Sequence, residues 1–231
     1  MPSHSLDVLR RLNRRVPPAV ARRAEEQTGA APVPARPSAS VVLLREVPAA
    51  DGSRRLMTFL LHRHARMAFA PSVVVFPGGG VDPVDERAGG DPLLACAIRE
   101  TEEETGVRLP ADALHPWAHW VTPEVEPRRY DTVFYVAALP TGAEAVDVSG
   151  ETEHAEWRTP ASALASAARG ELVLMPPTLS VLLELADQPD LAAVEEAARD
   201  RVVATVLPGL RRSGSGWEFV YPSTPARGSV G

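Results

Sequence analysis

The chain has 231 residues, of which 45% are hydrophobic, and this length allows one sizeable packed domain. The chain has 24 arginines and no lysine, which excludes Schiff-base lysine chemistry and a Walker-type phosphate loop. Cys96 is the single cysteine, so the chain can form neither an internal disulfide nor a multi-cysteine zinc site.

The charge and hydrophobicity of the chain bear on its partners. A formal net charge of −6 at pH 7 disfavours general electrostatic attraction to nucleic acid. No stretch approaches the ~18 consecutive apolar residues of a membrane span, and the N-terminus lacks the hydrophobic core of a secretory signal. We therefore expect no nucleic-acid partner, no membrane partner and a cytoplasmic location.

The first 38 residues are rich in arginine, proline and alanine. They predict two short amphipathic helices, interrupted by Pro17 and Pro18, and then a linker. We therefore predict three parts of the chain: a surface appendage over residues 1–38, a main domain over 39–222 and a flexible tail over 223–231.

Short apolar runs and helical patterns alternate through the main domain. Ser40–Leu44 and Leu56–Leu61 predict a hairpin, and Trp117–Val121 and Thr132–Ala138 predict a second pair of strands. Three helices and two strand-like runs are predicted further along: Pro160–Ala168, Pro177–Ala186, Leu191–Arg199, Val202–Leu207 and Trp217–Tyr221. The pattern indicates an α+β fold with a C-terminal helical extension from about residue 172.

One more helix is predicted near the middle of the chain, over about Pro92–Thr105. Asp91 is a candidate N-cap, proline occupies the first helical position, and Gly106 is a typical C-terminal stop. At 100° per residue, one stripe of this helix lies opposite its charged residues, and we expect that stripe to be buried. It is formed by Leu94, Ile98, Thr101 and Thr105.

The other face of this helix is charged, because Arg99, Glu100, Glu103 and Glu104 project from it together. Like charges at this spacing repel, so a cation is expected beside them. Arg99 supplies one positive charge, and a divalent ion with oxygen ligands would supply the rest. A solvated acidic face is the alternative, since runs of charge usually mean solvation.

Three consecutive glycines, Gly78–Gly80, follow the apolar run Val73–Phe76. A turn alone needs one or two glycines, so three indicate a sharp turn or the close approach of another group. The spacing of the two segments then resembles the Nudix hydrolase signature. The matching residues, in chain order, are Gly79, Asp85, Arg99, Glu100, Glu103, Glu104, Gly106 and Val107.

This chain departs from the signature in three ways. Asp85 stands where the family has Glu, thirteen residues instead of seven separate it from Arg99, and Thr101 occupies an apolar position. The longer spacer contains two glycines and is interpreted as a loop inserted before the helix.

The resemblance implies a Nudix fold, a mixed sheet between helices in three layers, and a site for Mg²⁺ or Mn²⁺. The implied metal ligands are the Gly78 carbonyl and the carboxylates of Glu100, Glu103 and Glu104. Arg99 is expected to be structural and to pair with Glu103 and Asp85. The general base is expected to be Glu100 first, with two residues of a later loop, Glu151 and Glu153, as the alternatives.

Substrate contacts are predicted at four positions. Arg63 and Arg66 suit diphosphate oxygens, because guanidinium binds phosphate in a bidentate manner. Arg129 and Asp131 lie in a polar loop of a length that is often functional. A purely solvated role is the alternative for each. His62 and His64 also raise the possibility of a metal, but no third ligand lies nearby in the sequence.

The resemblance extends beyond the signature to a branch of the family that contains acyl-coenzyme A diphosphatases. The similar segments are Phe76–Gly79, Cys96–Thr101, Trp120–Pro123, Arg129–Thr132 and Leu174–Thr178. The implied reaction splits coenzyme A or acyl-coenzyme A into 3′,5′-ADP and a phosphopantetheine compound. ADP-ribose, NADH and dinucleoside polyphosphates are alternative substrates, and a non-catalytic nucleotide-binding regulator is an alternative function. A homodimer is possible on family grounds.

Overall fold

The computed structural model describes residues 7–26, 31–50, 52–64, 73–150, 152–214 and 216–222. One mixed sheet of eight strands lies at its centre, with the order β3-β2-β1-β6-β5-β8, while β4 pairs with β1 and β7 pairs with β2. The strands are β1 (Arg36–Pro48), β2 (Arg54–Arg63), β3 (Val74–Val75), β4 (Gly78–Gly80), β5 (His115–Val121), β6 (Tyr130–Ala138), β7 (Thr152–Arg158) and β8 (Thr205–Val206). The β1–β6 and β5–β8 pairs are parallel, and the others are antiparallel.

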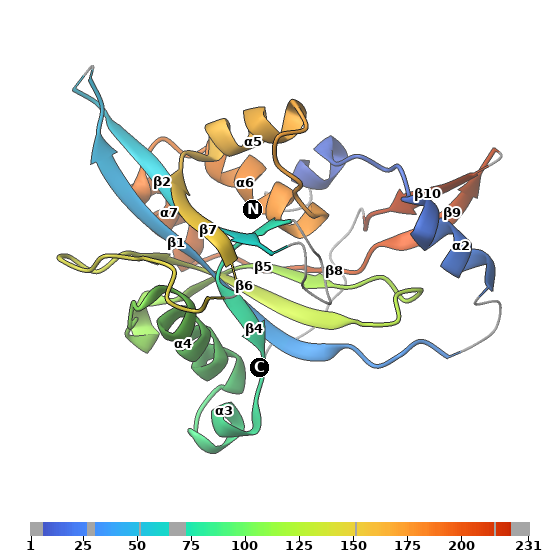
Figure 1. Cartoon of the computed structure of the whole chain (residues 1–231), viewed down its shortest axis with the longest axis horizontal. Coiled ribbons are helices and arrows are strands. Elements are labelled where there is room, and N and C mark those ends of the chain that lie inside the picture. The colour runs from blue at the N-terminus through green and yellow to red at the C-terminus, as the bar shows by residue number, and fades with distance from the viewer. Residues whose placement is uncertain are drawn as a thin grey trace.

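Helices cover both faces of this sheet, which gives the three predicted layers (Figure 1). One face carries α4 (Pro92–Thr105) with α3 (Pro83–Arg87) beside it, and the other carries α5 (Pro160–Ala168), α6 (Pro176–Ala186) and α7 (Leu191–Arg199). Two 3₁₀ turns, η1 (Leu9–Arg11) and η2 (Ala111–Ala113), and helix α2 (Pro18–Glu26) are the other helical elements of the described residues. No helix in the described ranges combines the length and apolar character needed to cross a bilayer.

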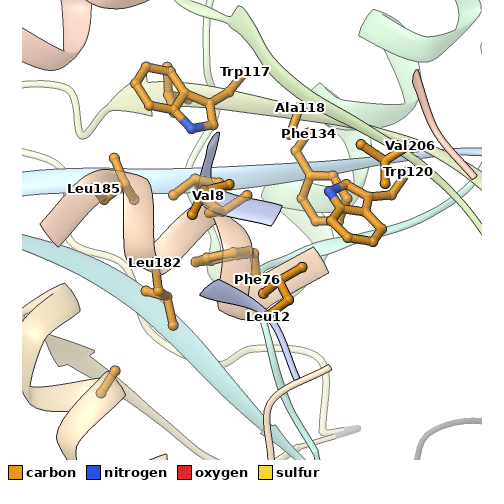
Figure 2. Packing of buried hydrophobic residues seen from close by; sticks show 14 of the residues in the cluster. Val8, Leu12, Phe76, Trp117, Ala118, Trp120, Phe134, Leu182, Leu185 and Val206 are labelled. Atoms are coloured by element: carbon orange, nitrogen blue, oxygen red, sulfur yellow. The ribbon is translucent and has the colours of Figure 1, made fainter. Parts of the chain in front are cut away.

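Each face of the sheet has its own hydrophobic core. In β1, Val42 and Leu44 belong to the core beneath α5 and α6, whereas Val41 and Leu43 belong to the core beneath α4. All four are at most 1% exposed. The continuous apolar run in β1 therefore reflects burial on both faces of the sheet. Figure 2 shows the first of these cores.

The N-terminal segment is part of the first core, so the prediction of a surface appendage is wrong for these residues. Five of its apolar side chains are at most 8% exposed, namely Val8, Leu9, Leu12, Val16 and Val20. The segment also meets the C-terminal hairpin of β9 (Gly209–Ser213) and β10 (Gly216–Val220), where the Phe219 amide donates to the Arg14 carbonyl at 2.8 Å.

The boundary at residue 39 also differs from the fold. Residues 36–38 were predicted to lie in a linker, but they are the first residues of β1 and pair with residues 130–132 of β6. The pairing supplies backbone partners that composition does not reveal. The other proposed domain limits stay predictions, and the predicted tail at 223–231 lies outside the described residues.

Most predicted elements are confirmed. The α4, α5 and α7 helices have the predicted limits, and α6 starts one residue early, at Pro176. The predicted strand at Val202–Leu207 is reduced to the two residues of β8. The loop predicted in the spacer before α4 is present at residues 88–91, which belong to no helix or strand. The short helix α3 before it was not predicted, and Asp82 and Asp85 form a capping box at its start.

Candidate functional site

Helix α4 begins and ends where local chemistry places its caps. The Asp91 carboxylate accepts a hydrogen bond from the Leu93 amide at 2.9 Å, and Pro92 occupies the first helical position. Gly106 ends the helix with φ 72°, a left-handed conformation that glycine adopts without strain. These caps fix the register of the acidic residues along the helix.

The buried face of α4 places the helix against β4 and β1. Cys96 and Ala97 are fully buried there, and the Cys96 thiol donates to the Gly79 carbonyl at 3.5 Å. Thr101 is also fully buried, although the family has an apolar residue at this position, and its hydroxyl donates to the Ala97 carbonyl at 2.7 Å. The substitution is therefore accommodated inside the helix, and the charged face is held along the glycine strand.

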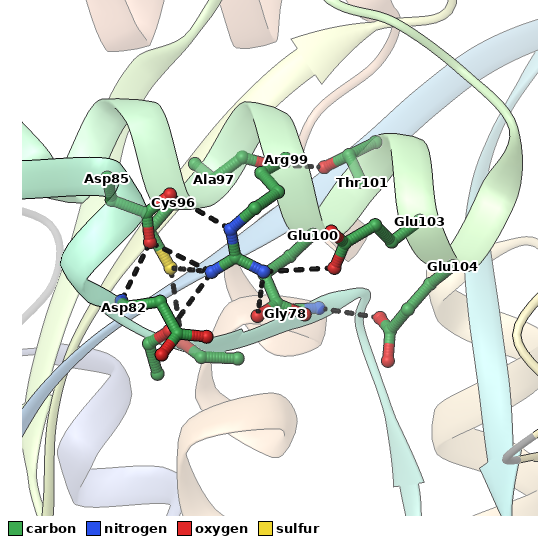
Figure 3. A network of polar contacts seen from close by, with 12 residues as sticks. Gly78, Asp82, Asp85, Cys96, Ala97, Arg99, Glu100, Thr101, Glu103 and Glu104 are labelled. Carbon is green, nitrogen blue, oxygen red and sulfur yellow. Dashed lines mark hydrogen bonds and ion pairs between the residues drawn. The ribbon is translucent and has the colours of Figure 1, made fainter. Parts of the chain in front are cut away.

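Arg99 lies at the centre of a polar network on that charged face (Figure 3). Its guanidinium donates to both oxygens of Asp85, at 2.9 and 2.8 Å. The same group donates to Glu100 at 2.8 Å, to Glu103 at 2.9 Å and to the Gly80 carbonyl at 3.2 Å. The expected ion pairs of Arg99 with Glu103 and Asp85 are thus present, and one guanidinium ties α3, α4 and β4 together.

Asp85 is the buried end of this network. Its side chain is only 3% exposed, and it also accepts from the Asp82 amide at 2.8 Å. Hydrogen bonding to Arg99 holds the pKa of Asp85 below its usual value, although burial acts in the opposite direction. The shorter Asp in place of the family's Glu therefore still reaches the arginine from helix α3.

Asp85→Asn is expected to lower the free energy of unfolding at pH 7 by about 2 kcal/mol, because a buried charged pair loses one partner. Since the folded chain lowers the pKa of Asp85, its stabilisation is present above about pH 4 and is lost as pH falls through the folded value. Urea unfolding of parent and variant across acidic pH measures this difference. If the difference in unfolding free energy between parent and variant stayed constant down to about pH 2, the stabilising role of the Asp85 charge would be contradicted.

Glu100 and Glu104 lie against the glycine strand. The Gly78 amide donates to the Glu104 carboxylate at 2.8 Å. At Gly79, a Cβ atom would fall 2.3 Å from a Glu100 carboxylate oxygen, so the missing side chain leaves the space that Glu100 occupies. Burial raises the pKa of Glu100, and the pairing with Arg99 partly opposes this rise.

The two glycines predict different outcomes on substitution by alanine. Gly78 has φ 153°, and its Cβ would meet the Ala39 carbonyl oxygen at 2.3 Å, so Gly78→Ala should destabilise the fold by about 3 kcal/mol. The Cβ of Gly79→Ala would meet only the end of a flexible side chain. This variant should keep most of its stability while displacing the Glu100 carboxylate. Denaturant unfolding measured beside an activity assay separates the two; equal loss of stability would contradict this reading.

The residues along β4 suit a hard divalent cation. The side-chain atoms on the charged face that could bind a metal ion are all carboxylate oxygens, the ligand type that Mg²⁺ and Mn²⁺ prefer. Three carboxylates share the single guanidinium of Arg99, and Glu104 adds a fourth carboxylate beside the Gly78 amide, which leaves an excess of negative charge. Glu100 and Glu103 meet at Arg99, whereas Glu104 meets the Gly78 amide (Figure 3). An ion held by all three would therefore replace some of these contacts.

Arg129 and Asp131 take part in contacts within the chain. Arg129 is 8% exposed, and its guanidinium donates to the carbonyls of Thr122 and Val33 at 3.0 and 2.7 Å. Asp131 pairs with the imidazole Nε2 of His119. Arg129 thus holds the backbone of two segments together, and the predicted substrate contacts of Arg129 and Asp131 stay predictions.

The remaining predicted positions lie on β2 and β7 or outside the described residues. Arg63 is the half-buried last residue of β2. Glu153 is exposed and forms a bulge in β7, because the register passes from the His62–His154 pair directly to Arg63–Thr152. Bulges are frequent beside active sites, which keeps Glu153 as a candidate base. Arg66 and Glu151 lie outside the described residues.

Sequence reasoning missed a polar cluster at the β5–β8 edge of the sheet. His119 of β5 contacts Asp131 through Nε2 and the Thr205 hydroxyl through Nδ1, the latter at 2.9 Å. Thr205 comes from β8, which pairs with β5 in parallel. The separation of 86 residues between His119 and Thr205 leaves no local signal for this contact.

The mixed sheet, the helix with its acidic face and the glycine strand beneath it define a known class of proteins. Residues 34–176 match the family model of the NUDIX domain, which is more than half of the chain. The chain therefore belongs to the Nudix family.

Two relatives illustrate the match. The chain is 28% identical over 191 residues to a Caenorhabditis elegans protein named "Putative nudix hydrolase 7", covering 67% of this chain and 62% of that protein. It thus spans about three fifths of the length of that curated relative. A crystal structure of a Nudix hydrolase from Alicyclobacillus acidocaldarius superposes with a TM-score of 0.61 at 23% identity, covering 71% of this chain and 96% of that one. At that identity the likeness shows the fold alone.

Proposed function

We propose that the protein is a metal-dependent hydrolase that cleaves a diphosphate linkage in nucleoside diphosphate-linked compounds. Membership of the Nudix family supports this reaction class. The observation that carries the proposal is the placement of Glu100 and Glu104 against the backbone of Gly78 and Gly79, with Arg99 holding Glu103 beside them.

In this proposal the Gly78 carbonyl and the carboxylates of Glu100, Glu103 and Glu104 hold Mg²⁺ or Mn²⁺. Such ions, when bound, neutralise phosphate oxygens and lower the pKa of a bound water. Arg99 keeps the carboxylates in register through its three ion pairs and acts as a positioning residue.

The general base of the reaction is proposed to be Glu100. Its carboxylate lies in the space that Gly79 leaves open, beside the other carboxylates that would hold the ions. Glu153 at the bulge of β7 and Glu151 are the alternatives. A pH profile of Glu153→Gln that matches the parent would support Glu100.

We propose coenzyme A or acyl-coenzyme A as the substrate, with 3′,5′-ADP and a phosphopantetheine compound as products. Support comes from the segments outside the common signature that resemble this branch, such as Trp120–Pro123 and Leu174–Thr178. ADP-ribose, NADH and dinucleoside polyphosphates are compatible with the same site, because the helix carboxylates act on the diphosphate and leave the rest of the substrate open. A cytoplasmic location and a homodimer are also proposals.

The experiment is a substrate screen with purified protein and Mg²⁺ or Mn²⁺, with products identified by mass. Coenzyme A, acyl-coenzyme A, ADP-ribose and NADH are compared, and each assay is repeated with Glu103→Gln to exclude contaminating activity. Release of 3′,5′-ADP from coenzyme A supports the full proposal. Cleavage of another compound alone keeps the hydrolase and overturns the substrate. Tight nucleotide binding without any turnover would favour the non-catalytic regulator.

A further inference from the structure

We propose that His62, His154 and Glu156 form a second divalent-metal site, suited to an ion such as Zn²⁺ and separate from the carboxylates of α4. Within the described part of the chain, this is the group of His, Cys, Asp and Glu side chains whose donor atoms all lie within 4.8 Å of one another. The proposed hydrolysis does not use these residues, so the site is additional to that function.

Strand pairing brings the three residues together. His62 of β2 lies directly opposite His154 of β7, and Glu156 follows two residues further along β7. The two imidazole rings stack with centroids 3.7 Å apart, and Nε2 of His62 lies 2.7 Å from a Glu156 oxygen. Opposite side chains on paired strands have Cβ atoms about 5 Å apart, so the sheet itself sets this proximity.

The cluster lies on the face of the sheet opposite α4. Along β2, Leu60 belongs to the core beneath α5 and α6, and Leu61 belongs to the core beneath α4. Because side chains alternate between faces, His62 lies on the same face as Leu60. Arg158, which follows Glu156 on that side of β7, donates to Ser166 of α5 at 2.8 Å. The sheet therefore separates this cluster from Glu100, Glu103 and Glu104.

The donor set favours a transition-type ion over magnesium. Two imidazoles and one carboxylate, with a position left for water, match a common three-ligand set for Zn²⁺, whereas Mg²⁺ prefers oxygen ligands alone. Ligand atoms around tetrahedral Zn²⁺ lie roughly 3.3 Å apart, so binding needs a small rearrangement in which Nε2 of His62 and the Glu156 oxygen, now 2.7 Å apart, separate slightly. The side chains of His62 and Glu156 are 14% and 26% exposed, which leaves the group accessible from solvent.

Arg158 has a defined place beside this site. Its Nε lies 2.8 Å from the same Glu156 oxygen that contacts His62, and its Nη1 is anchored on Ser166. A metal bound by Glu156 would displace the contact with His62 while Arg158 keeps the carboxylate oriented. Outer partners of this kind are typical of metal-binding carboxylates.

The test uses Co²⁺ as a spectroscopic probe and Zn²⁺ as the competitor. The full chain carries Glu104→Gln, which weakens the α4 site, and excess Mg²⁺ is present throughout. We expect one equivalent of Co²⁺ with the visible absorption of a tetrahedral ion, displaced by Zn²⁺. His62→Gln and His154→Gln should each weaken binding at least about tenfold. His115 is a histidine of β5 outside the cluster, so His115→Gln is the matched control and should leave Co²⁺ binding unchanged.

Two results would overturn the site: no Co²⁺ binding in this background, or binding that His62→Gln and His154→Gln leave unchanged. Either result would show that His62 and Glu156 form only a hydrogen-bonded pair, with the ring of His154 stacked on His62. Far-UV circular dichroism checks folding, and Glu156→Gln serves as the third ligand variant if a histidine variant unfolds. Hydrolysis with Mg²⁺ by His154→Gln in the otherwise unchanged chain should equal that of the parent, which separates this proposal from the proposed function.

Discussion

Glu103→Gln is expected to lower Mg²⁺-dependent diphosphate hydrolysis by about a thousandfold, because a negatively charged donor is lost where charge must be neutralised. The fold should survive. The Glu103 side chain is 58% exposed and accepts a hydrogen bond from Arg99 at 2.9 Å. Initial rates at saturating Mg²⁺, together with a thermal unfolding curve, measure the two effects separately.

Glu102→Gln is the matched control for this experiment. Glu102 lies on the same helix and is 49% exposed, but it points to Arg108 instead of the network around Arg99. The control should retain parental activity. If Glu103→Gln were as active as Glu102→Gln, the proposed metal site on α4 would be wrong, whatever the substrate.

Leu12→Ala is expected to reduce the free energy of unfolding by about 3 kcal/mol, since truncating a buried leucine leaves a cavity. Leu12 is 4% exposed and belongs to the same core as Phe76 and Leu182 (Figure 2). Urea unfolding provides the measurement. Val202→Ala, at a side chain that is 73% exposed, is the control and should change stability by less than about 0.5 kcal/mol.

The Leu12 result bears on the limits of the folding unit. The family match covers residues 34–176, but the core beneath α5 and α6 includes side chains before and after that range. Leu12 precedes it, and Val194 and Phe219 follow it. If Leu12→Ala behaved like the exposed control, the N-terminal segment would contribute nothing to the stability of the Nudix domain, contrary to its burial.

Local patterns predicted α4 and its charged face correctly. The Asp91 cap and the Gly106 stop act within one turn of the helix, so the sequence alone locates both ends. Helical periodicity then places Arg99, Glu100 and Glu103 on one face, and their contacts confirm that arrangement. The predicted roles in metal binding and catalysis remain proposals.

Predictions failed where partners come from distant parts of the chain. Residues 36–38 resemble a linker in composition, yet they pair with β6 almost a hundred positions later. The sequence around His62 offers no third metal ligand, whereas the fold places His154 and Glu156 beside it. Alternation along β7 could have placed these two on one side of a strand, but nothing local identifies β2 as its neighbour.

The amino-acid sequence by itself determined the parts of the proposed metal site: the glycine run, the capped helix and the spacing of its carboxylates. These features depend on bonds within a few residues, so they are encoded locally. The tertiary structure decided which remote groups meet, including His119 of β5 with Thr205 of β8, and the N-terminal leucines with the main core. Sheet pairing and core packing join residues far apart in the chain, and their free energy depends on the whole set of contacts rather than on any single segment.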